Sequence, residues 1–102
     1  MKNFAQTKLI LLDLKINHRD LYKEILNVFN KIDPCNFFAI GLQEEYDIEI
    51  SWILADLKTF EIDEIRQTIV RVFDEWLGYE FKNAEQLDEL ARKIYDVVKK
   101  YV

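Results

Sequence analysis

The side chains with the most chemical potential in this chain are carboxylates between residues 44 and 56. Glu45, Asp47 and Glu49 alternate along the sequence, and carboxylates bind hard divalent cations or exchange protons in catalysis. On a helix, however, Glu45 and Glu49 share a face while Asp47 points away from them. The segment also lacks the glycine that a calcium-binding loop requires. A carboxylate-based divalent-metal enzyme using Glu45, Asp47 and Glu49 is therefore the last of three functional interpretations. We expect no metal site and no cofactor.

Nucleophiles and nucleotide-binding motifs are also poorly represented. His18 lies at an expected helix start with no serine or cysteine nearby in sequence, which favours a capping or solvent-exposed role over catalysis. Cys35 is the only cysteine, which excludes an internal disulfide and suits a reducing cytoplasm. Gly41 and Gly78 stand where helices are expected to end, and neither belongs to a phosphate-binding loop. We therefore predict that the protein has no catalytic residues and is not an enzyme.

Aromatic side chains beside the acidic residues give a stronger functional signal. Tyr46 and Trp52 lie within the acidic stretch, and Phe60 follows it. Aromatic anchors surrounded by charge are typical of protein-binding surfaces, although the hydrophobic core is the more common place for such rings. The expected partner-binding surface consists of Glu44, Glu45, Tyr46, Asp47, Glu49, Trp52 and Asp56.

The net charge of −5 arises from one segment. Residues 44–65 contain eight acidic residues and one base, Lys58, so this segment carries −7 and the remainder of the chain +2. Such an imbalance would repel the phosphates of a nucleic acid from the middle of the chain and favours a basic protein partner. The alternative is that these acids form only the solvated face of a helix.

Apolar residues recur at three- and four-residue spacing in four segments, which predicts amphipathic helices. Asn83 with Gln86 resembles a helix cap before the last segment. Gly78 suits the left-handed end of the helix before it. A third helix carries the apolar residues between 46 and 57, and a fourth starts near residue 18 and ends at Asp33-Pro34. A short helical turn closed by Gly41 is expected after this Asp-Pro pair.

Residues 1–16 allow two interpretations. Apolar residues at every second position from 10 to 16 alternate as in a strand, whereas those at 5, 9, 12 and 16 have helical spacing. A lone strand would leave its backbone groups without partners in a helical chain, so helix is favoured. The apolar run Leu9 to Leu12 is cut by Asp13 and is too short for a signal sequence or a membrane span. A cytoplasmic protein with no membrane partner is therefore expected.

These segments predict one all-α domain over residues 1–102, a compact bundle of four to five helices. Several motifs add a resemblance. Asp33-Pro34 is followed by a short apolar stretch and the segment Glu44–Ile50, and Phe73-Asp74-Glu75-Trp76 precedes the last helix. In this order the motifs resemble the YugE-like family of small bacterial helical proteins of unknown function, over about residues 18 to 101. The resemblance implies an all-helical bundle and no known activity. Cys35-Asn36-Phe37-Phe38 departs from the glycine or small aliphatic residue common in the family.

The function that these patterns favour is a non-enzymatic protein–protein interaction module. Its most concrete form is an immunity-type protein that neutralises a basic toxin through the acidic and aromatic surface between Glu44 and Asp56. The chain lacks the helix pattern of colicin nuclease immunity proteins, so this prediction rests on size and charge. The alternative is a self-associating structural or regulatory protein that forms homo-oligomers through residues 1–16.

Overall fold

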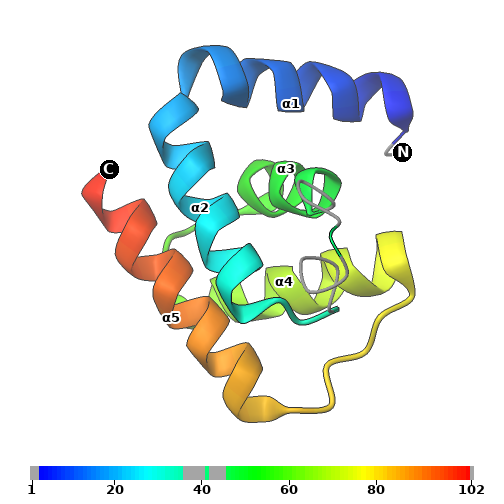
Figure 1. The fold of residues 1–102 in the computed structure, drawn as a ribbon, viewed down its shortest axis with the longest axis vertical. Coiled ribbons are helices and arrows are strands. Elements are labelled where there is room, and N and C mark those ends of the chain that lie inside the picture. Colours follow the sequence, from blue (N-terminus) through cyan, green and yellow to red (C-terminus); the bar gives the residue numbers. More distant parts are fainter. Residues whose placement is uncertain (1–2, 36–40, 42–45, 102) are drawn as a thin grey trace.

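The computed structural model of this 102-residue chain describes residues 3–35, 41 and 46–101. Within these ranges the fold is all-α, as predicted, and contains no strand (Figure 1). No helix in the described ranges is both long enough and apolar enough to cross a membrane. The five helices are α1 (Phe4–Asn17), α2 (Arg19–Ile32), α3 (Asp47–Asp56), α4 (Ile62–Leu77) and α5 (Ala84–Lys100).

The N-terminal segment is a helix and not a strand. Asn3 caps α1 by accepting a hydrogen bond from the backbone nitrogen of Gln6 at 2.9 Å, which satisfies one of the free amides at the helix start. His18 ends α1 and begins α2, and its backbone nitrogen donates to the carbonyl of Leu14 at 3.0 Å. The chain turns sharply at this residue, so α1 lies across one end of the molecule while α2 descends into it (Figure 1).

The predicted helix ends are confirmed at three places. Asp33 has a left-handed backbone with φ of 50° and ends α2 immediately before Pro34. Gly78, with φ of 59°, ends α4 in the same conformation, which costs glycine nothing because it has no Cβ. Asn83 caps α5 by accepting from the backbone nitrogen of Gln86 at 3.0 Å. The turn predicted after Pro34 lies outside the described residues.

Three fully buried rings form the centre of the core. Phe29 of α2 lies 5.4 Å from Tyr46 and 5.8 Å from Phe73 of α4, measured between ring centroids. Tyr46 and Phe73 stack at 6.2 Å. Phe81, in the segment before α5, packs against Phe73 at 5.1 Å. This aromatic cluster joins α2, α4 and the start of α3, because each large ring excludes water from the others.

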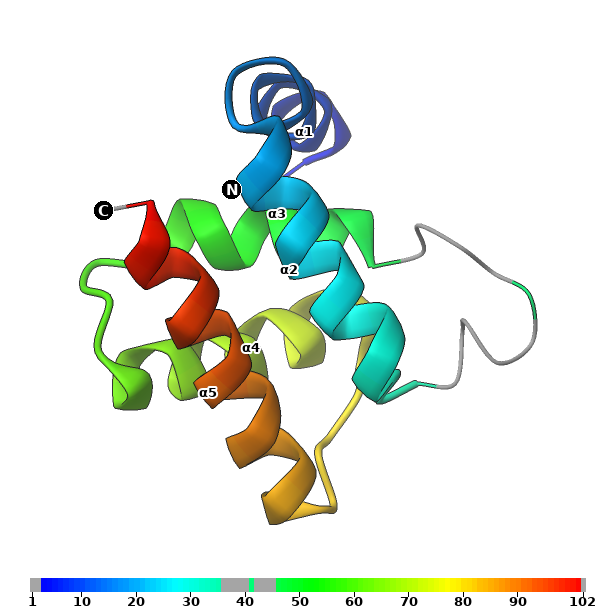
Figure 2. The same cartoon turned by 60° about the vertical axis from the view of Figure 1, so that its left-hand side comes forward.

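Helix α1 covers α3 from outside this core. It packs against α2 and α3, and Figure 2 shows it almost end-on above the other helices. One buried polar contact fixes its position, since the Trp52 indole donates to the Thr7 hydroxyl oxygen at 2.9 Å. That hydroxyl donates in turn to the backbone oxygen of Asn3 at 2.8 Å. The inner face of α1 is therefore held on α3, and its opposite face is left toward solvent.

Candidate protein-interaction surface

The structure encloses much of the acidic and aromatic segment predicted to bind a partner. Tyr46 is fully buried, Trp52 is 7% exposed and Glu49 is 1% exposed. The favoured placement of both rings in the core is confirmed, whereas the exposed position predicted for Glu49 is wrong. The physical reason is that α3 packs against α1, α2 and α4, so residues 49–53 are all buried. This stretch of α3 has no solvent-exposed face.

Tyr46 has a structural position between α2 and α3. Its hydroxyl donates to Asp33 Oδ1 at 2.7 Å and accepts from the backbone nitrogen of Cys35 at 3.0 Å. Burial, together with the hydrogen bond to Asp33, raises the pKa of Tyr46 far above its usual range. Burial and the nearby Glu49 raise the pKa of the Cys35 thiol to about 11. That thiol is protonated at neutral pH, the opposite of what an activated nucleophile requires.

The remaining predicted residues do not form a free acidic surface in the described part of the chain. Asp47 accepts from Lys15 Nζ at 3.5 Å. Burial raises the pKa of Asp47, and the Lys15 ammonium opposes that shift. Asp56 lies 3.8 Å from Arg71 of α4. Glu44 and Glu45 are outside the described residues. No group of three histidine, cysteine or acidic side chains that could hold a metal ion occurs among the residues the structure describes.

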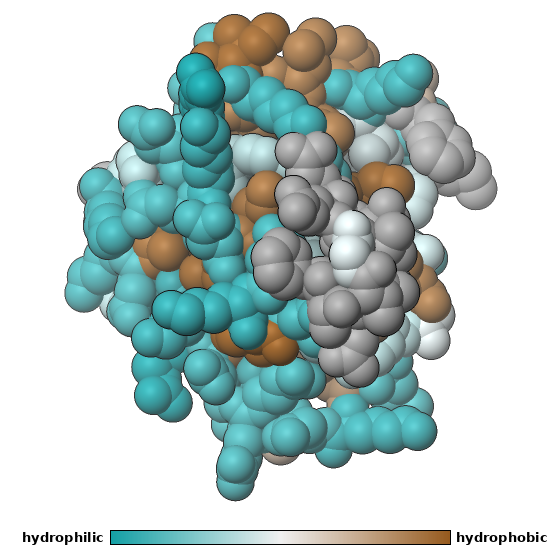
Figure 3. Space-filling view, in the orientation of Figure 1, coloured by the Kyte–Doolittle hydropathy of each residue, from teal (hydrophilic) through white to brown (hydrophobic). Residues whose placement is uncertain are grey.

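Among the residues the structure describes, the most exposed large apolar side chains lie instead on α1. Leu9, Leu12 and Ile16 are 69%, 56% and 67% exposed, and Ala5 is exposed one turn before Leu9. We call these four residues the α1 stripe. Their spacing of four, three and four residues places them on one face of the helix. Apolar residues gather along the upper edge of the molecule in Figure 3, over α1. Neighbouring residues Thr7, Leu11 and Leu14 occupy the inner face toward the rest of the fold.

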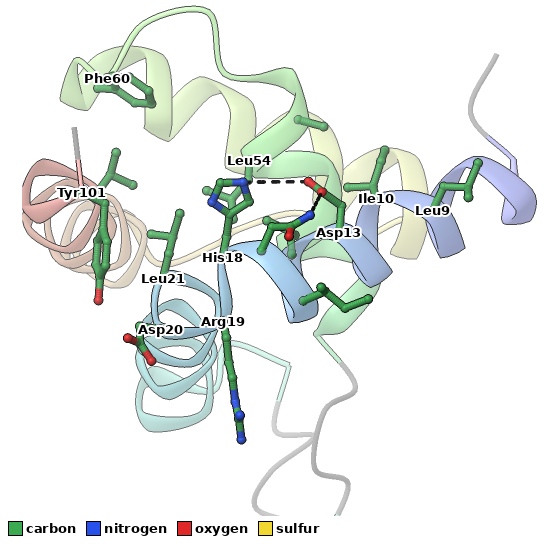
Figure 4. Close-up of a pocket in the computed structure, with 15 residues that line it drawn as sticks. Leu9, Ile10, Asp13, His18, Arg19, Asp20, Leu21, Leu54, Phe60 and Tyr101 are labelled. Atoms are coloured by element: carbon green, nitrogen blue, oxygen red, sulfur yellow. Dashed lines mark hydrogen bonds and ion pairs between the residues drawn. The ribbon is translucent and has the colours of Figure 1, made fainter.

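A groove continues from the α1 stripe across to the C-terminal end of α5 (Figure 4). Its volume is about 920 Å³, enough to receive several side chains of a partner. Asp13, His18, Arg19 and Asp20 also border it. The Arg19 guanidinium opposes two carboxylates, so the net charge at the border is small. The groove therefore suits apolar side chains better than a strongly charged ligand. Its apolar lining comes from Leu9, Ile10, Leu14, Ile16, Leu21, Leu54, Ala55, Phe60, Val98 and Tyr101.

Hydrogen bonds fix two walls of this groove. Asp13 accepts from Asn17 Nδ2 at 2.7 Å, and His18 Nε2 lies 3.9 Å from the other oxygen of the same carboxylate. At the opposite wall Glu24 accepts from the Tyr101 hydroxyl and from Lys100 Nζ. These bonds lower the pKa of Glu24 and, through the Glu24 carboxylate, raise the pKa of Tyr101 to about 12. The last turn of α5 is thereby attached to α2 beside the groove.

A second exposed surface joins α3 to α4. Phe60 is 46% exposed and Ile62 is 39% exposed, and the exposed acids Glu61 and Asp63 alternate with them. The association of aromatic and acidic side chains predicted for residues 44–56 therefore occurs on the surface a few residues later. The alternation of these residues from Phe60 to Asp63, across the start of α4, was readable from the sequence. Their exposure was not, because Ile62 also matches the apolar stripe of that helix.

Comparison of this chain with protein-family models, curated proteins and solved structures found no match.

Proposed function

We propose that this chain is a protein–protein interaction module that binds a polypeptide through the α1 stripe and the adjoining groove. The observation that carries the proposal is the exposure of Leu9, Leu12 and Ile16, each more than half accessible on one face of a capped helix. Burial of apolar surface stabilises a complex by about 25 cal/mol for each Å² removed from water. Contiguous apolar surface of this kind on a small domain marks a binding site more often than scattered exposed residues do.

The inner face of α1, which packs against the rest of the fold, supports the same proposal. Thr7 receives the Trp52 hydrogen bond on the inner face, and Leu14 is buried there. The inner face therefore suffices to attach α1 to the fold. The apolar residues of the α1 stripe make no comparable contribution to this attachment. Contact with a partner is therefore the simplest explanation of their apolar character. The proposed relationship to the YugE-like family rests on its motifs alone and adds no activity to this account.

Photo-crosslinking in the producing cells tests the proposal. A benzoylphenylalanine at position 12 is expected to give discrete crosslinked products on irradiation, because the ring would lie inside the contact. The same residue at position 70 is the matched control, since Val70 is 40% exposed on α4 and lies outside the groove. The absence of products from position 12, or the same products from both positions, would contradict a binding surface on α1.

A second candidate is the immunity-type role, in which the protein neutralises a basic toxin. It is favoured by the exposed surface of Phe60, Glu61, Ile62 and Asp63, where an aromatic anchor is combined with negative charge. Opposite charges mainly accelerate encounter between partners. Capture that depends on Glu61 and Ile62, which lie outside the groove, and that weakens as salt is raised, with no dependence on Leu12, would favour this role over binding through α1.

A further inference from the structure

The α1 stripe has the residue pattern of one half of a two-stranded helical seam. Its members Ala5, Leu9, Leu12 and Ile16 are spaced four, three and four residues apart, which is the a/d spacing of two heptads. A groove-binding peptide needs no such periodicity on the surface that receives it. A second helix with the same spacing, by contrast, fits it by packing side chains between side chains along the whole stripe.

The charges beside the stripe indicate which helix would fit. Lys8 precedes Leu9 on one side of the stripe, and Asp13 follows Leu12 on the other side, five residues later. In a parallel pair of helices these are the positions that meet across the seam. A second copy of α1 would therefore place Lys8 against the partner's Asp13, and the two-fold symmetry would form this pair twice.

The antiparallel arrangement of two copies is electrostatically worse. It would bring Lys8 beside the partner's Lys15, because residues on the same side of the stripe then face one another. Lys15 is not needed to pair with a second copy, because its ammonium already contacts groups of its own chain. Its Nζ lies 3.5 Å from Asp47 and 5.6 Å from the centre of the Tyr22 ring. Asp13 retains 57% exposure of its side chain despite its contacts with Asn17 and His18, so its carboxylate is accessible to a partner.

We infer that the chain forms a parallel two-fold dimer through α1, with the α1 stripes of two copies in contact and Lys8 paired with the partner's Asp13. This inference names the partner of the proposed function and rests on it. Because four residues per copy line the seam, the interface is expected at the small end of specific contacts, below about 1,200 Å² in total. The dimer should therefore dissociate on dilution. A membrane surface is a poorer fit, since interfacial helices have polar faces rich in Lys and Arg, whereas α1 carries only Lys8 and Lys15 against Asp13.

Sedimentation equilibrium over a concentration series tests the dimer. The mass of the wild-type protein is expected to rise from 12.3 kDa toward twice that value. Leu12→Glu should remain at the monomer mass at every concentration, and its helical circular dichroism should be unchanged because position 12 is exposed. Val70→Glu, the control at another exposed apolar position, should associate like the wild type. A wild-type protein that stays monomeric throughout would overturn the inference.

A charge exchange tests the parallel orientation. Lys8→Asp and Asp13→Lys should each weaken association at least several-fold, and the double variant should restore it because the pair re-forms with reversed sign. Loss of association without rescue would exclude the parallel pairing. Binding of a monomeric protein to anionic phospholipid vesicles through Leu12 would assign the stripe to a membrane and overturn both proposals. A monomeric protein that still gives crosslinked products with a different protein from position 12 would overturn only the dimer.

Discussion

Phe73→Ala is expected to lower the free energy of unfolding by about 3–5 kcal/mol. Phe73 is fully buried and contacts four other rings, those of Phe29, Tyr46, Tyr79 and Phe81. Truncation removes its transfer free energy and leaves a cavity that these rings can fill only in part. Small domains are stable by about 5–15 kcal/mol, so this one change should consume much of the total. Urea denaturation followed by circular dichroism measures it.

Val70→Ala is the matched control for Phe73→Ala, because Val70 lies on the same helix and is 40% exposed. Its effect should stay within about 0.5 kcal/mol of the wild type. If both variants unfold at the same urea concentration, the aromatic cluster is not the centre of the core. The side chain of Trp76 is only half-buried against Trp52, so Trp76→Ala should cost less than Phe73→Ala.

Glu49→Lys is expected to destabilise the fold strongly, by about 3 kcal/mol or more. Glu49 is 1% exposed within α3, so the substitution would place a longer ammonium side chain where no water can solvate it. Moving an ionised group out of water costs several kcal/mol unless charges and hydrogen bonds around it are arranged for that ion. The surroundings of Glu49 accommodate a carboxylic side chain. The measurement is again the free energy of unfolding in urea.

Two controls separate burial from charge in the Glu49→Lys experiment. Glu49→Gln keeps the shape with a side chain that cannot ionise, and it should cost less than the lysine. Glu61→Lys makes the same substitution at an exposed position, the N-cap of α4, and should cost at most about 1 kcal/mol, because the helix dipole disfavours a positive charge there. Equal stabilities for Glu49→Lys and Glu61→Lys would show that Glu49 faces solvent, contrary to the structure.

Periodicity and end signals predicted the helices of this fold from sequence. The stripes of α2, α4 and α5 each fit a single buried face, and Asp33, Gly78 and Asn83 mark ends that depend on local backbone chemistry alone. For α1 the helical spacing was readable, but its apolar residues point to two faces. The face that packs inward is set by the contact between Thr7 and Trp52, which lie 45 residues apart in the sequence. Local pattern carries no information on such a contact.

The candidate site was predicted less well than the fold, for a related reason. Acidic residues beside aromatic ones in residues 44–56 suggested a surface, because charged side chains are almost never fully buried. In the structure α3 packs against three other helices, so the polar position Glu49 is enclosed with its apolar neighbours. The sequence suggested self-association through residues 1–16 as an alternative, without singling out residues 9, 12 and 16. Their exposure could be established only once the inner face of α1 was identified.

Amide resonances followed by NMR during dilution of the purified protein test the central claim, that α1 is the surface through which the chain binds. Contact between two α1 stripes should shift the amides of residues 5–16 progressively with concentration, because their surroundings change as the dimer forms. Amides of α4 around Val70 should stay constant over the same range. Shifts confined to residues 58–64 would contradict binding through α1, and spectra that do not change with concentration would contradict the α1 dimer.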